Sequence, residues 1–345
     1  MAQVAQDRAA AAVVAVSAPE AGAAGAGVTA DAPKSAHKRP REDVRPPAQA
    51  KAARPEAAPS EAELRRMTWG ELIAHLRDAA RPGAGLLAKL TLRVVAVRAI
   101  EEGSRDAAVT AGVLPTLVAV MHAHSTTAAV QEQACWALAN ITYGTDAQSI
   151  ARKQAVVDAD ALPRIVAAMG APSATAALQM EACSALISIT AGTDAQGSAR
   201  KQAAADAGAL PQIIAAMRAP SATAAVQEWA CRALAHITHG TDAQADLRRQ
   251  VAVAAEALPQ IVAAMGAPSA TAAMQEQACW ALYTITFGTD AQRYARKQAA
   301  VNVGVLPLLE ALRTHSNEKV KRQAWIVYAS LAEAAFRGLL HLNVA

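Results

Sequence analysis

Two histidines and a cysteine form the first group of residues in this sequence that could do chemistry. His236 and His239 lie three residues apart and close to Cys231, and helical side chains at that spacing share one face. Imidazole and thiolate groups bind zinc, but zinc usually takes four ligands. Only the two histidines face one direction, so we interpret them as a metal-free pair on a helix surface. The sequence predicts no metal site and no cofactor.

The cysteines are evenly spaced. Cys135, Cys183, Cys231 and Cys279 follow one another at intervals of 48 residues. A disulfide needs Cα atoms within about 7 Å, whereas packed helices lie about 8 to 10 Å apart. We therefore expect unpaired, buried thiols in a reducing compartment, the cytosol or the nucleus.

Motifs of catalysis are missing from the sequence. It contains no glycine-rich phosphate loop, no nucleophile elbow and no paired-cysteine metal signature. We find no constellation of acid, base and nucleophile in their place. The sequence therefore predicts a protein without catalytic residues that is not an enzyme.

Side chains suited to protein binding recur in a repeated segment whose frame reads ACxALxxITxGTDAQ. Four columns of this frame vary between copies, and together they form what we call the variable face: Gln133, Glu181, Trp229 and Gln277; Trp136, Ser184, Arg232 and Trp280; Asn140, Ser188, His236 and Thr284; Tyr143, Ala191, His239 and Phe287. Within one copy these columns step by three, four and three residues, which places them on one stripe of a helix. Aromatic and arginine residues dominate binding hot spots, so the variable face is the predicted partner-binding groove.

The tryptophans divide into two groups. Trp136, Trp229 and Trp280 occupy columns that hold Ser, Arg, Glu or Gln in other copies, and columns that accept such residues are seldom buried. We expect these three to be exposed in the groove. Trp325 stands in the cysteine column of the last unit, and we expect it in the core.

A Leu-Pro pair sets the period of the whole array. It recurs every 48 residues, at Leu114, Leu162, Leu210, Leu258 and Leu306, and a fixed period of this size indicates a helical solenoid. Apolar residues make up 53% of the chain but aromatic residues only 3%, because alanine, the best helix former, dominates. The pattern predicts an all-α protein.

Helix-capping and helix-breaking residues divide each unit into three helices. In GTDAQ we expect Gly144 to end one helix and Thr145 to cap the next, with Gln148 completing a capping box. Gly208 and Pro211 mark the start of a short second helix, and the third helix is the longest. The predicted core includes Leu162, Ile165, Met169, Leu186 and Ile189.

The chain divides into a tail and an array. Residues 1–59 are rich in Ala and Pro, and we expect them to be disordered. Their basic cluster, Lys38, Arg39 and Arg41, could serve as a nuclear-import signal or be a merely solvated charge cluster. Residues 60–345 form the predicted solenoid, with an N-terminal cap unit at 60–103, four regular units at 104–303 and a C-terminal cap unit at 304–345.

AGALPQIIAAM followed by VQEQACWALANIT resembles the second and third helices of the armadillo-repeat family, over roughly Ser60 to Ala335. The resemblance implies a right-handed α-solenoid whose third helices line a concave groove for extended peptides or partner proteins. Units of that family usually have about 40 to 47 residues. The additional residues here fall in GTDAQSIARKQ and APSATAA.

Within that family, importin-α-like members grip a peptide with a Trp and an Asn four residues later. Only Trp136 and Asn140 match this pair. A receptor for basic nuclear-localisation peptides is therefore the alternative function, with the chain's own HKRPRED segment as its internal inhibitor.

Charge and hydropathy restrict the partners further. The net charge of +4 is spread along the chain, whereas nucleic-acid binding needs basic residues clustered on one face. The longest apolar runs are well short of a membrane span. We predict a monomeric scaffold or adaptor in the cytoplasm, the nucleus or both, which binds a protein or an extended peptide, with nucleic acid a less favoured partner and no membrane association.

Overall fold

The computed structural model describes residues 59–101, 103–288 and 291–342, with side chains described up to residue 334. All regular secondary structure in this part of the chain is helical. The array begins with α2 (Glu61–Arg66), α3 (Trp69–Ala79) and α4 (Gly85–Arg98). The tail and its candidate signal residues Lys38, Arg39 and Arg41 lie outside the described residues.

Five sets of three helices follow. The first helices are α5 (Ser104–Thr110), α8 (Ala147–Asp158), α11 (Ala195–Asp206), α14 (Ala243–Ala254) and α17 (Arg293–Asn302). The second helices are α6 (Val113–Ala123), α9 (Ala161–Met169), α12 (Ala209–Arg218), α15 (Ala257–Gly266) and α18 (Val305–Leu312). The third helices are α7 (Ala128–Ile141), α10 (Ala176–Thr190), α13 (Ala224–Thr238), α16 (Ala272–Thr286) and α19 (Glu318–Leu342).

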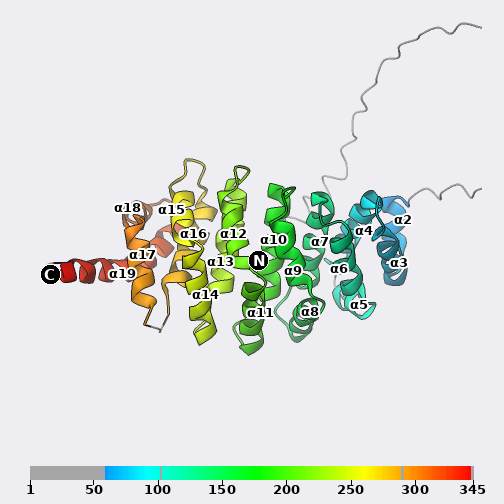
Figure 1. Ribbon diagram of the computed structural model, residues 1–345, viewed down its shortest axis with the longest axis horizontal. Helices are drawn as coiled ribbons and strands as arrows, with labels where there is room; N and C mark the ends of the chain where they lie inside the picture. Colours follow the sequence, from blue (N-terminus) through cyan, green and yellow to red (C-terminus); the bar gives the residue numbers. More distant parts are fainter. Residues whose placement is uncertain (1–58, 102, 289–290, 343–345) are drawn as a thin grey trace, which may run out of the picture. The chain divides into compact units, whose positions relative to one another are not determined.

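The third helices form the continuous spine of the array. Each packs against the third helix before and after it, in the order α4, α7, α10, α13, α16 and α19, and Figure 1 shows the units following one another in chain order. The predicted core residues of the repeat are buried. They are Leu162, Ile165, Met169, Leu186 and Ile189. The four cysteines are free and buried, as predicted.

Three of the first helices, α8, α11 and α14, are capped by aspartate and not by the predicted threonine. The Asp146 carboxylate accepts a hydrogen bond from the Ser149 amide at 2.6 Å. Asp194 and Asp242 cap α11 and α14 in the same way. A carboxylate also interacts favourably with the positive end of the helix dipole, so the Asp of GTDAQ is the better cap, and Thr145 stays exposed.

A buried arginine closes the C-terminal end of four third helices, α7, α10, α13 and α16. The Nε atoms of Arg152, Arg200, Arg248 and Arg296 donate to the carbonyls of Ile141, Ile189, Ile237 and Ile285 at 2.8 to 3.0 Å. None of the four arginines is more than 5% exposed. Carbonyls of the last helical turn have no partner within the helix, so these guanidinium groups satisfy acceptors that would otherwise be buried and unpaired.

The next residue in the chain fixes the adjoining glycine loop. Lys153 and Lys201 each donate from Nζ to a glycine carbonyl at 2.7 Å, that of Gly144 and of Gly192. Arg249 donates to the Gly240 carbonyl in the corresponding place. The two adjacent basic residues therefore hold both the helix end and the turn that follows it.

A glutamine performs a similar task for the second helices. Gln131 Nε2 donates to the carbonyls of Met121 and His124, both at 2.8 Å, and Gln179 Nε2 donates to the Met169 carbonyl at 2.8 Å. The second helix of each of these units is thus closed by its own third helix, and that third helix is closed by the next first helix.

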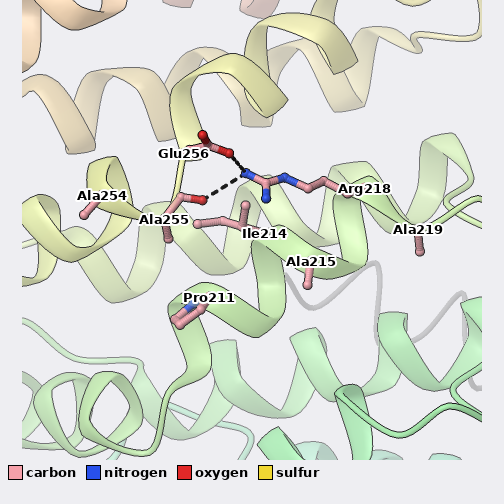
Figure 2. A pocket seen from close by; sticks show the side chains of 8 residues that line it. All are labelled: Pro211, Ile214, Ala215, Arg218, Ala219, Ala254, Ala255 and Glu256. Carbon is pink, nitrogen blue, oxygen red and sulfur yellow. Dashed lines mark hydrogen bonds and ion pairs between the residues drawn. The ribbon is translucent and has the colours of Figure 1, made fainter.

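The turns that lead into the second helices are of two kinds. Gly112, Gly208 and Gly304 adopt positive φ there, but Asp160 and Glu256 adopt φ of 63° and 65° in the same place. Figure 2 shows one reason: Arg218, at the end of α12, donates to the Ala255 carbonyl at 3.1 Å and to the Glu256 carboxylate at 2.6 Å. Where the preceding second helix ends in Gly170 or Gly266, the turn residue is glycine.

The prediction for Trp325 is wrong. The side chain is 58% exposed, although it occupies the position of the fully buried Cys279. Cys279 lies between two third helices, whereas no described helix follows α19 to cover Trp325. Ala324 and Val327 supply the buried contacts of α19 instead.

Over the described residues, no single helix has the length and apolarity to cross a membrane. One helix pair, Ser104–Thr110 with Val113–Ala123, meets the length and composition criteria together, but it is bent by 75°.

Replacing Arg152 with alanine should lower the stability of the array strongly. The change leaves the carbonyls of Ile141 and Tyr143 and the carboxylate of Asp106 without their bonded guanidinium. Removing one partner of a buried charged network costs about 3 to 5 kcal/mol. Thermal unfolding followed by circular dichroism measures the loss, with Arg66→Ala as the control. Arg66 is exposed, so this change should alter stability by under about 0.5 kcal/mol. Equal melting temperatures for the two variants would contradict the capping role.

Replacing Asp160 with glycine should stabilise the protein. A left-handed conformation costs an ordinary residue about 1 kcal/mol that glycine does not incur. The reverse change, Gly208→Asp, should lose a similar amount, and urea unfolding measures both. Destabilisation by Asp160→Gly would show that the carboxylate contributes more than its backbone conformation costs.

Candidate binding groove on the third helices

The side chains of the variable face are mostly half-buried. Thirteen of the fifteen predicted binding residues are half-buried: Gln133, Trp136, Asn140, Tyr143, Glu181, Ser184, Ser188, Trp229, Arg232, His236, Gln277, Trp280 and Phe287. His239 is exposed, and Ala191, which shares its column, is half-buried. The columns therefore lie along the surface of the spine and sink partly between neighbouring helices.

Thr284 does not belong to this surface. It is 2% exposed, its hydroxyl donates to the Ala281 carbonyl at 3.0 Å, and it accepts a bond from the Thr238 hydroxyl at 3.1 Å. A short side chain in this column sinks between the third helices, so its predicted place in the groove is wrong.

The same column joins consecutive units. Asn140 Nδ2 donates to the Ala96 carbonyl on α4 at 2.9 Å, and Ser188 Oγ donates to the Ala139 carbonyl on α7 at 3.1 Å. An asparagine that gripped a peptide backbone would use this same amide group, and here one of its hydrogens is already donated within the array. The column therefore contributes to stacking as well as to the surface.

The three groove tryptophans each present part of their ring. Trp136, Trp229 and Trp280 pack against the continuous core without being buried in it. The guanidinium of Arg232 lies 5.1 Å from the centre of the Trp229 ring, and the His236 ring meets Trp280 edge-on with centroids 5.0 Å apart. Together α13 and α16 form an aromatic patch that carries one arginine.

The electrostatics differ along the face. Burial raises the pKa of Glu132, an effect that Lys89 and the bond from Gln133 partly offset. Burial lowers the pKa of His236 to about 3, and Arg232, Lys201 and His239 add to the effect. At neutral pH, His236 is therefore an uncharged aromatic ring.

The fourth column forms a second row of ring contacts. The Arg105 guanidinium lies 5.3 Å from the ring centre of Tyr143, and that of Arg249 lies 5.5 Å from Phe287. The Phe287 ring also contacts Tyr283, with 5.6 Å between centroids. Guanidinium groups, half-buried in Arg105 and buried in Arg249, thus lie against the rings at the C-terminal ends of these third helices.

Neither a metal cluster nor a reactive thiol emerges from the described residues. No group of three or more His, Cys, Asp and Glu side chains there could hold a metal ion. Burial raises the pKa of Cys183 and of Cys279 to about 12, so these thiols stay protonated at neutral pH.

Two surface hollows lie away from the variable face. One of about 430 Å³ is lined by α12 and the turn before α15, and one of about 710 Å³ by α11, α14 and the loops that precede them. An extended peptide follows an open stripe of residues and does not need an enclosed pocket, so these hollows do not decide where such a partner would bind.

The adjacent basic residues are a structural feature that the sequence analysis did not predict. Arg152–Lys153, Arg200–Lys201, Arg248–Arg249 and Arg296–Lys297 recur with the period of the repeat. Their constancy between copies was the available signal, since it matches the constancy of the buried Ala, Cys and Leu positions.

Acid should destabilise the protein through His236. A histidine whose pKa is lowered by folding binds its proton in the unfolded chain first, so stability falls as pH drops from about 6.5 toward 3. His236→Gln removes this contribution, which amounts to about 1 to 2 kcal/mol at pH 5. Melting temperatures at pH 7 and pH 5 check this, with the exposed His122→Gln as the control. An unchanged pH dependence in His236→Gln would contradict the described burial of the ring.

Comparison with known proteins supports this architecture. The family model of the armadillo/beta-catenin-like repeat matches residues 102–143, a stretch that contains α5, α6 and α7. A search of curated proteins found no match.

Solved structures share the array. The crystal structures of two engineered proteins from the Northeast Structural Genomics Consortium align with 77% and 78% of this chain and 98% of their own, each with a TM-score of 0.64 and 26% identity. A designed armadillo repeat protein aligns over 76% of this chain and all of its own, with a TM-score of 0.62 and 23% identity, which shows a common fold. The repeat matched at residues 102–143 and the stacked three-helix units shared with these structures together show that the chain folds as an α-solenoid of the armadillo type.

Proposed function

We propose that this protein is a scaffold or adaptor that binds an extended segment of a partner protein along the variable face of its third helices. The armadillo solenoid is commonly a protein-binding scaffold and is typically non-enzymatic. The observation that carries the proposal is the contrast within each third helix. One side of the helix has the same buried residues in each unit. The other side changes residue type from unit to unit and stays partly accessible.

The dimensions suit an extended chain. Four third helices at spacings of about 8 to 10 Å give a face about 30 Å long. A peptide that rises about 3.3 Å per residue would cover it with roughly nine residues. Trp136, Trp229 and Trp280 supply three anchoring points along this length, and tryptophan is among the residues that contribute most to binding energy.

The import-receptor alternative gains less support. It relies on a repeated Trp and Asn pair, and only Trp136 and Asn140 provide one. The Asn140 amide is partly engaged with the Ala96 carbonyl, and its column continues with Ser188, His236 and the buried Thr284. We therefore propose a different ligand class for this face.

Truncating Trp136, Trp229 and Trp280 to alanine should abolish partner binding. Affinity purification from cells with quantitative mass spectrometry compares the triple variant with the parent protein. The control carries Leu247→Ala and Val251→Ala, two exposed residues of α14 whose equivalents in α8 and α11 are alanine. We expect the control to retain the partners that the triple variant loses.

The folding of each variant must be checked alongside, because the tryptophans are half-buried. Circular dichroism should show the helicity of the parent protein at the assay temperature. A folded triple variant that captures the same partners as the parent would refute the proposed groove.

A further inference from the structure

The helix α19, at one end of the array, has an uncovered side. Each of α7, α10, α13 and α16 packs between two other third helices, and the cysteine of each is fully buried. By contrast, α19 packs against α16, α17 and α18, and no described helix lies on its other side. Figure 1 shows α19 as the last helix of the array. Trp325, which stands in the cysteine column, is therefore 58% exposed.

A stripe of exposed residues runs along this uncovered side. Arg322, Trp325 and Ala329 are exposed and follow one another at steps of three and four residues, so they share one face of the helix. Ile326, beside Trp325, is 38% exposed. We name these four residues the α19 stripe. Within the described part of the chain, the side chains of Arg322 and Trp325 make no hydrogen bond, ion pair or ring contact.

The opposite side of α19 is fixed to the array. Leu331 is fully buried there. The Tyr294 hydroxyl on α17 donates to the Ala334 carbonyl at 3.0 Å, and the Arg313 guanidinium lies 4.5 Å from the ring centre of Tyr328. The helix could not rotate to bury its stripe without breaking these contacts, so the stripe stays at the surface.

The other end of the array is closed. There α2 packs against α4, and Leu64, Leu72 and Val94 form a small separate core between the helices. The end units of repeat proteins need a polar outer face to stay soluble. The α19 stripe departs from this rule at Trp325 and Ile326, and tryptophan is among the residues that contribute most to binding energy at interfaces.

We infer that the α19 stripe binds the same stripe of a second copy of this chain, with the two α19 helices antiparallel. The contact continues the packing of third helix on third helix that already joins consecutive units. It uses the open end of both copies, so it is self-complementary and closes after two chains. The inference goes beyond the proposed groove, and it replaces the monomer predicted from the sequence with a dimer.

The residue types of the stripe favour the antiparallel arrangement. A two-fold axis near residue 327 would place Trp325 of each copy against Ala329 of the other, and large side chains interdigitate well with small ones. It would also separate the two Arg322 residues by about ten helical positions, or about 15 Å along the helix. A parallel pair would set these like charges side by side.

Sedimentation velocity of the full chain tests the inference. One helix pair buries less than a standard interface of about 1,600 Å², so we expect a weak dimer that forms between about 1 µM and about 100 µM. Trp325→Lys should raise its dissociation constant at least about tenfold. Leu86→Lys is the matched control, because Leu86 is an apolar residue of α4 that is 68% exposed. Both variants should melt like the parent protein, and the control should dimerise like it.

A mixture of two variants tests the antiparallel arrangement. Ala329→Glu alone should weaken the dimer, because it places a carboxylate against each Trp325. Mixed with Trp325→Lys, it should form a dimer that is tighter than that of either variant alone. One Lys and Glu pair and one original Trp and Ala pair would then face each other across the axis.

A chain that stays monomeric up to about 100 µM would overturn the inference, whether its own tail or another protein covers the stripe. A dimer that survives Trp325→Lys, one that is lost in Leu86→Lys, or assemblies larger than two chains would overturn it as well. A mixture that shows no recovery would overturn the antiparallel pairing. The proposed groove is tested separately, because the variant lacking Trp136, Trp229 and Trp280 should dimerise like the parent protein.

Discussion

The array depends on the buried guanidinium groups that close the ends of α7, α10, α13 and α16. Taking a charge out of water costs several kcal/mol unless bonded partners compensate it. Carbonyls at the C-terminal end of a helix provide that compensation, because they are unpaired acceptors at the negative end of the helix dipole. Arg152 and its equivalents place the buried guanidinium against the unpaired carbonyls of the helix end, so the cation and the helix end stabilise each other. Since the same first helix then begins the next unit, this bond also sets where that unit starts.

Internal repetition made most of the fold predictable. The predictions that failed concern repeat positions whose neighbours differ from one unit to the next. Leu186 and Cys183 are constant between copies because identical neighbours bury them in each unit. Trp325 occupies such a position at an end where no described helix covers it, so burial there depends on the neighbour and not on the residue. Thr284 shows the opposite case, because a short side chain in a variable column can sink between helices. Arg152 and Lys153 were not recognised as core because charged residues are almost always placed at the surface by composition alone.

Half-burial would give the tryptophans of the proposed groove two roles. Each ring contacts the continuous core on one side and can contact a ligand on the other. Trp280 also holds His236 through an edge-on contact. In the proposed groove, large rings in these columns would therefore tie the choice of ligand to the stability of the junction between two units. A change of specificity in α13 or α16 would alter the packing of its neighbour, whereas Ser184 in α10 could change with less effect on packing.

The pairing of Arg218 with Glu256 bears on how such an array can be lengthened or recombined. Both residues lie in the stretch that runs from Leu210 to Glu256, together with Arg248 and the Ile237 carbonyl that it caps. A cassette cut at successive Leu-Pro pairs thus carries its own helix closures and its own matched turn residue. A cassette cut at the GTDAQ loops would separate each arginine from the helix end it serves. Exchange of units between such proteins would therefore preserve stability when the crossover falls at the start of the second helix.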